Sequence, residues 1–191
     1  NTPTYAIGRS GQTTGLNRVD MLDSTGLIAS GFDELAGLSS GRVVEFEANS
    51  THVWVASTFD SNSFFATSIL QGEILQNGSV RWEYGYNLLD DDVINSMHLD
   101  GDTMWVTTAG RGLYSINLLQ RSYSSTAPAL HGQMDGMVLD DDDGMLYVGL
   151  MGNEGSAAGF QSFDTSSLSW GDGSLLAGLP NDIVKDFVGL G

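Results

Sequence analysis

The chain has 191 residues, of which 7 are Lys or Arg and 24 are Asp or Glu, so its formal net charge is −17. The electrostatic field of so negative a chain repels polyanions, and we therefore expect no nucleic-acid partner. The sequence contains no cysteine, which excludes disulfides and thiolate metal sites. No uninterrupted apolar run approaches the roughly 18 residues of a membrane helix, so we expect a soluble protein without membrane insertion.

The length and the glycine content predict one domain made of short strands. Domains usually hold about 100 to 200 residues, so 191 residues favour a single domain spanning 1–191. The 25 glycines and 3 prolines are typical of many tight turns rather than of a disordered chain. The opening Asn1-Thr2-Pro3, without a methionine, is expected of a processed chain, for example after removal of a signal peptide.

Alternating apolar and polar residues between turn residues predict strands along the whole chain. A first group of strands is expected at 4–7, 16–21 and 27–29, and a second at 43–48, 51–57, 64–70 and 80–86. A third group is expected at 93–99, 103–107, 113–116 and 121–125, and a fourth at 136–139, 145–150, 159–163 and 169–170. Asp100-Gly101-Asp102 has the composition of a tight hairpin turn inside the third group.

One strand core recurs through these groups. It is Tyr5-Ala6-Ile7, Val53-Trp54-Val55, Met104-Trp105-Val106 and Leu146-Tyr147-Val148, with the aromatics 49, 51 and 42 residues apart. Periods of about 40 to 50 residues built from short strands indicate propeller blades. The sequence therefore predicts an all-β fold, a β-propeller of about four blades at 1–41, 42–91, 92–132 and 133–182, each a four-stranded antiparallel meander.

The two ends of the chain complement each other. The first group has no first strand, and residues 183–188 form a spare strand with no blade behind it. We expect this C-terminal strand to complete the N-terminal blade and close the ring, which protects the sheet edges. Two alternatives remain open. Two chains could form one eight-bladed ring as a homodimer that exchanges strands, or the chain could be a fragment of a larger propeller.

The best-preserved repeats resemble the two-component regulator propellers, whose blades read roughly L-P-x-N-x-V, D-G-x-L-W-I-G-T and G-G-L. The matching residues are Leu179-Pro180-Asn181-Asp182-Ile183-Val184, Trp105-Val106-Thr107-Thr108 and Gly110-Arg111-Gly112-Leu113. The second repeat departs, with Ser57-Thr58-Phe59-Asp60 where the family has a G-T-x-G turn. The resemblance implies a periplasmic or extracellular sensing module.

Two patterns that suggest chemistry are better explained by structure. The aromatics Trp54, Trp105 and Tyr147 recur at equivalent positions, so we expect them to pack between blades rather than to form a sugar-stacking platform. The acidic run 140–143 lacks the alternating oxygens and the distal glutamate of a calcium loop, so we expect a solvated hairpin turn. His52, His98 and His131 fall at three different places in their blades. We therefore expect no metal site and no cofactor.

Propeller geometry predicts where a ligand would bind. The loops joining the second and third strands of each blade, and those joining one blade to the next, surround one mouth of the channel. The ligand-binding candidates on these loops are Arg9, Asp60, Asp90, Arg111, His131, Glu154 and Asp182.

The repeat resemblance implies a sensor-like role, and together with the absence of a catalytic motif it favours a non-catalytic propeller that binds a small molecule or a protein; no catalytic residue is predicted. One alternative is a polysaccharide-active hydrolase or lyase, which would need two carboxylates about 5 to 9.5 Å apart at the channel mouth. Another is a scaffold for protein assembly. The expected location is extracellular or periplasmic.

Overall fold

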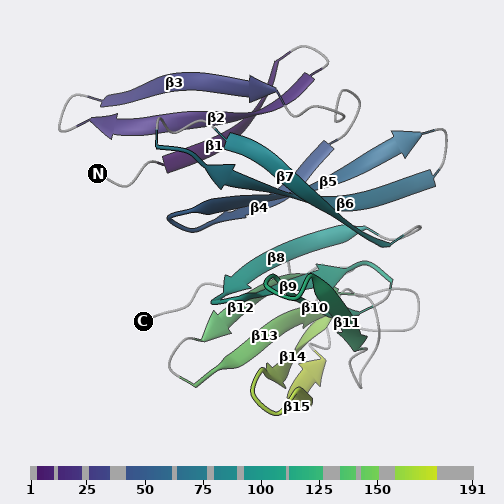
Figure 1. Cartoon of the computed structure of the whole chain (residues 1–191). Helices are drawn as coiled ribbons and strands as arrows, with labels where there is room; N and C mark the ends of the chain where they lie inside the picture. Colours follow the sequence, from purple (N-terminus) through teal and green to yellow (C-terminus); the bar gives the residue numbers. More distant parts are fainter. Residues whose placement is uncertain are drawn as a thin grey trace. The chain divides into compact units, whose positions relative to one another are not determined.

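The structure is a computed structural model in which all regular structure of the described residues is β-strand, without a helix (Figure 1). It describes residues 4–10, 13–22, 26–34, 42–61, 64–76, 80–89, 93–110, 112–126, 134–140, 143–150 and 158–175. The chain divides into two compact units, 1–91 and 92–191, and each is described by itself. The division falls at the predicted boundary between the second and third repeats.

The first unit holds two antiparallel sheets, in which each strand pairs with the next one along the chain. The first sheet has the order β1 (Thr4–Ser10), β2 (Thr13–Leu22) and β3 (Gly26–Glu34). The second sheet has the order β4 (Arg42–Ala48), β5 (His52–Ser61), β6 (Phe64–Ile74) and β7 (Val80–Leu89).

The second unit holds two four-stranded sheets of the same meander order. The third sheet consists of β8 (Ile94–Asp100), β9 (Thr103–Thr108), β10 (Leu113–Asn117) and β11 (Ser122–Thr126). The fourth consists of β12 (Met134–Asp140), β13 (Met145–Leu150), β14 (Gly159–Asp164) and β15 (Ser169–Leu175). All the strands predicted between 4 and 170 are therefore confirmed, and the three four-stranded meanders have the form expected of propeller blades.

The turns predicted from aspartate and glycine are also confirmed. Gly101 has φ +55° and Gly144 has φ +68°, values in the left-handed region that favours glycine. Beside the second turn, the Oδ1 atom of exposed Asp143 accepts a hydrogen bond of 2.8 Å from the backbone N–H of Met145. This carboxylate serves the hairpin, as expected of a turn residue.

The core of the second unit lies between the third and fourth sheets. Its buried members are Trp105, Leu113, Met134, Met137, Leu146, Val148, Leu150 and Phe163. The rings of Trp105 and Phe163 meet edge to face at 5.5 Å between centroids. Trp54 and Trp105 are each only 3% exposed, so the prediction that these two aromatics are core residues is confirmed.

One predicted strand is longer in the structure, and another lies outside the described residues. β5 continues to Ser61, so the predicted end at residue 57 is wrong; Thr58 and Phe59 favour strand and pair with β6 in place of the family's turn. The predicted closing strand, 183–188, lies outside the described residues. Ring closure, and the choice between one chain, two chains and a fragment, therefore stay predictions.

Candidate functional site

Two of the seven predicted ligand-binding residues have a described backbone, and both lie in strands. Arg9 pairs with Thr14 in the β1–β2 hairpin, and Asp60 pairs with Phe65 in the β5–β6 hairpin. Each is one pair short of the hairpin tip. Their predicted place in a loop is corrected to a strand end, because threonines and phenylalanines around the tips extend the ladders.

The other five predicted residues, Asp90, Arg111, His131, Glu154 and Asp182, lie outside the described residues. In the sequence, Arg111 falls between β9 and β10, and Glu154 between β13 and β14. Asp90 and His131 fall between consecutive sheets, and Asp182 follows β15. No side chain of the seven is among those that the structure describes, so the channel-mouth site stays a prediction.

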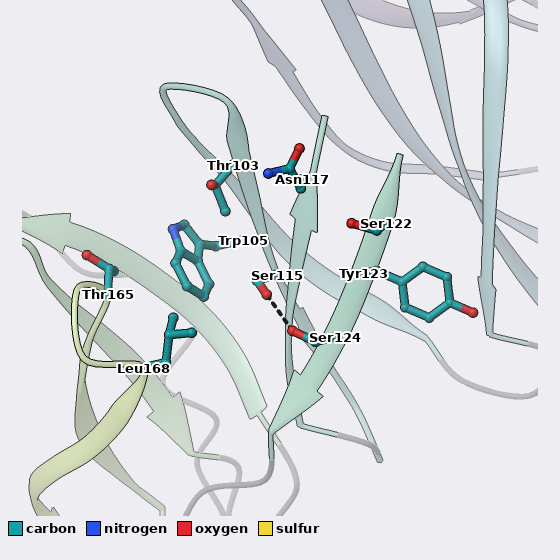
Figure 2. A pocket seen from close by; sticks show the side chains of 9 residues that line it. All are labelled: Thr103, Trp105, Ser115, Asn117, Ser122, Tyr123, Ser124, Thr165 and Leu168. Carbon is teal, nitrogen blue, oxygen red and sulfur yellow. Dashed lines mark hydrogen bonds between the residues drawn. The ribbon is translucent and has the colours of Figure 1, made fainter. Parts of the chain in front are cut away.

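The described part of the chain contains a cavity that the sequence analysis did not anticipate (Figure 2). Its volume is about 280 Å³. It is lined by Thr103, Trp105, Ser115, Asn117, Ser122, Tyr123, Ser124, Thr165 and Leu168. None of these residues carries a charge, although the chain as a whole is strongly acidic.

The register of the third sheet explains how most of these side chains come together. Thr103, Asn117 and Ser122 pair across β9, β10 and β11 as one row. The next row on the same face, two residues along each strand, is Trp105, Ser115 and Ser124. Figure 2 shows the ring of Tyr123 on the other side of β11, as strand alternation requires.

Trp105 forms the buried end of the cavity. Its ring is 3% exposed, and its Nε1–H has no hydrogen-bond partner. The serine opposite it is not a partner of this N–H, and Ser115 Oγ instead lies 2.8 Å from Ser124 Oγ (Figure 2). A buried unpaired donor costs about 1 to 3 kcal/mol, so this indole is an exception that calls for an explanation.

The fourth sheet closes one side of the cavity with the turn between β14 and β15. Leu168 has φ +54° and is 62% exposed, which is unusual for a large apolar residue. The turn is fixed by Asp164, whose Oδ1 accepts hydrogen bonds from Ser166 and Ser167. The side-chain hydrogen bonds from Ser166 and Ser167, followed by those from their backbone N–H groups, hold the pKa of Asp164 well below its usual range.

The second sheet carries longer side chains that contact one another at the equivalent place. Trp54 Nε1 donates to Gln71 Oε1 at 3.1 Å, and Gln71 is the register partner of Trp54. One row along, the ring of His52 stacks on Trp54 at 5.7 Å. The carboxylate of Glu73 on β6 forms an ion pair with Arg81 on the neighbouring strand β7. The corresponding positions of the third sheet carry Thr103, Ser115, Asn117 and Ser122, and these shorter side chains leave the space open.

The sequence contains an indication of this cavity, but it can be recognised only when the pairing register of the strands is known. Aligned on their tryptophans, the second and third repeats put Gln71 and Ser115 opposite the indole. The repeat of aromatic residues predicts which rings are buried, but it does not predict which hydrogen-bond acceptor each indole N–H has. Cross-strand partners cannot be paired before the turns fix the register.

The described part of the chain shows neither a metal-binding cluster nor a membrane-spanning helix. There, no group of three or more His, Cys, Asp and Glu side chains is placed to hold a metal ion. Likewise, among those residues no helix is long and apolar enough to cross a membrane.

Comparison with known proteins supports the fold. No protein-family model matches the chain, and no curated protein matches it. Among solved structures, it is similar to the extracellular domain of BT4673 from B. thetaiotaomicron, a protein assigned as a one-component system, with a TM-score of 0.52 and 15% identity. The match covers 88% of this chain and 21% of that one, so the chain spans about a fifth of its neighbour. At this identity the likeness concerns the fold alone.

Proposed function

We propose that this chain is an extracellular, sensor-like propeller that binds a small molecule or a protein without transforming it. The observation that carries the proposal is the order of the described strands. Arg9 and Asp60 lie in the β1–β2 and β5–β6 hairpins, and in the sequence Arg111 and Glu154 fall between β9 and β10 and between β13 and β14; we expect these four connections to be equivalent in the repeats. Connections on a rigid repeated scaffold are the usual place for recognition.

The location and the sensing role rest on two likenesses. The solved neighbour is an extracellular domain of a one-component system, and the repeats resemble those of two-component regulator propellers. The acidic balance of the chain favours ligands that are neutral or cationic over polyanions. The alternatives, an enzyme acting on polysaccharide and an assembly scaffold, are not favoured by any described contact and stay predictions.

The proposal is tested by thermal unfolding of the 191-residue chain with calcium, neutral sugars, amino acids and basic peptides. A ligand at 100 times its Kd adds about 2.7 kcal/mol, which is about 5 to 10 °C in Tm for a chain of this size. Arg111→Ala and Asp60→Asn should reduce the shift, and Arg121→Ala, outside the predicted loops, is the matched control. A shift that both loop variants keep in full would contradict a site at the channel mouth.

A further inference from the structure

We propose that the cavity of the third sheet is a second binding site, for a small uncharged polyhydroxyl ligand such as a monosaccharide or a polyol. The site is separate from the channel mouth. Thr103 and Asn117 pair at the end of the β9–β10 ladder, whereas Arg111 follows the opposite end, beyond the pair of Thr107 with Leu113. The cavity is therefore at the other end of these strands from the predicted loops.

The unpaired indole identifies one contact of the ligand. Of the three tryptophans whose side chains are described, Trp54 donates to Gln71 and Trp170 donates to Thr126 Oγ1 at 3.2 Å. Trp105 is the exception, and it lines the cavity. Figure 2 shows its nitrogen on the side of the ring that faces Thr103, within the polar row. A ligand oxygen in the cavity would accept this hydrogen bond.

The remaining walls define the chemistry of the ligand. Ser115, Ser122, Ser124 and Thr165 are hydroxyl residues, and hydroxyls both donate and accept hydrogen bonds. The Trp105 ring and the Leu168 side chain add apolar surface for C–H groups. Among the described residues, no charged side chain lines the cavity, and a charged ligand would lose its hydration there without an ion-pair partner. An uncharged molecule that carries several hydroxyls on a hydrocarbon frame matches this lining.

The size of the cavity agrees with a small ligand. Its volume of about 280 Å³ lies just below the range of drug-sized ligand sites, about 300 to 1,000 Å³, as expected for a smaller ligand. A smaller hollow of about 60 Å³ adjoins it, sharing Trp105, Ser115, Ser124 and Leu168. One sugar ring or a linear polyol fits, and a long chain would have to extend past Leu168 into solvent.

The comparison of sheets shows which residue decides whether the site exists. Gln71 pairs with Trp54 and fills the second sheet, and Ser115 takes its place in the third. We therefore assign Ser115 as the residue that keeps the cavity open. Ser115→Gln would supply the missing acceptor and occupy the space, as in the second sheet.

The test follows the indole N–H signals of the ¹⁵N-labelled chain by NMR. The chain has 4 tryptophans, and Trp105→Phe assigns the relevant signal. D-Glucose, D-galactose, xylitol and glycerol are titrated, with the acetate anion and zwitterionic glycine as probes that carry charged groups. We expect at least one neutral probe to shift the Trp105 signal saturably and the charged probes to leave it unchanged. Ser115→Gln should weaken that binding at least tenfold, and the matched Ser174→Gln, on an exposed position of β15, should not change it.

Three results would overturn the proposal. The Trp105 signal could stay in place with every neutral probe, which would mean that water alone occupies the cavity. It could shift equally with neutral and charged probes, or shift equally in Ser115→Gln. Should Ser115→Gln fail to fold, Trp105→Phe is measured by calorimetry with the best probe: it keeps the ring packing and removes the donor, and about tenfold weaker binding is expected. The loop variants Arg111→Ala and Asp60→Asn should not affect this site, so its failure is distinguishable from that of the channel-mouth proposal.

Discussion

At the scale of single residues, the second and third sheets differ in whether the buried tryptophan N–H has a hydrogen-bond acceptor. Trp54 and Trp105 occupy the same place in successive repeats and are equally buried. Only Trp54 has an acceptor for its N–H. The second sheet is thus closed by its own side chains, while the third leaves both space and a donor.

A first prediction concerns the hydrogen bond in the second sheet. Gln71→Ala leaves the buried Trp54 N–H without this acceptor, and we expect the free energy of unfolding to fall by about 1 to 3 kcal/mol. Urea denaturation followed by tryptophan fluorescence measures the change. Gln120→Ala, at an exposed position before β11, should change it by no more than about 0.5 kcal/mol. Equal effects of the two substitutions would contradict the assigned bond.

A second prediction concerns pH and the turn that carries Leu168. The pKa of Asp164 is lowered in the folded chain, while an unfolded aspartate titrates near pH 3.9. Its carboxylate therefore stabilises the fold above about pH 4, and this contribution is lost as the pH falls below that value toward the folded pKa. Asp164→Asn keeps an acceptor oxygen and removes the titration.

The measurement is the difference in Tm between the parent chain and Asp164→Asn from pH 7 to pH 2. Taking this difference cancels the titration of the other acidic residues. We expect a constant advantage of the parent chain down to about pH 4 and a decline below it. A difference that grows on acidification would show that the Asp164 carboxylate does not hold the turn.

At the scale of elements, tight turns and close strand approaches set the register on which the cavity depends. The β14–β15 ladder brings Gly173 opposite Gln161. A Cβ at Gly173 would lie 2.7 Å from the backbone oxygen of Phe160, closer than such atoms come. This edge of the fourth sheet therefore requires glycine.

A third prediction follows from that contact. Gly173→Ala should push β15 away from β14 and lower the free energy of unfolding by about 1 to 3 kcal/mol. Hydrogen exchange of the β15 amides should accelerate more than that of β9 and β10. Ser174→Ala, next along the strand and exposed, serves as the control and should leave both readings unchanged. Protection of β15 that survives in Gly173→Ala would disprove the close approach.

At the scale of the whole molecule, the open point is which segment pairs with the edge of the first sheet as its fourth strand. Among the described residues it has three strands, as the sequence predicts, and each of the other sheets has four. The candidate for the missing strand is 183–188, outside the described residues. An unpaired edge invites pairing with another chain.

A fourth prediction therefore concerns association. If 183–188 completes the first sheet within one chain, sedimentation should give a monomer of 20.3 kDa at all concentrations, which is the result we expect. A chain truncated after residue 182 should then lose stability and self-associate through the open edge. A species of twice the chain mass, dissociating on dilution, would instead support the two-chain ring.

The sequence by itself determined the strands, their order and their grouping. Alternation has a period of two and turns are marked by Asp and Gly, so both are local and can be read without neighbours. The repeat of the aromatic core likewise predicted that Trp54 and Trp105 are buried. The ends of β1 and β5 were less predictable, since how far a ladder extends depends on the partner strand.

Only the tertiary structure decided where the described chain has room for a ligand. The cavity exists because Trp105, Ser115 and Ser124 fall into one cross-strand row, and because a turn of the next sheet lies beside them. Each of these residues is ordinary in sequence, and a serine opposite a tryptophan acquires meaning only through register and packing. The proposed second site therefore depends on contacts between strands, which no local pattern encodes.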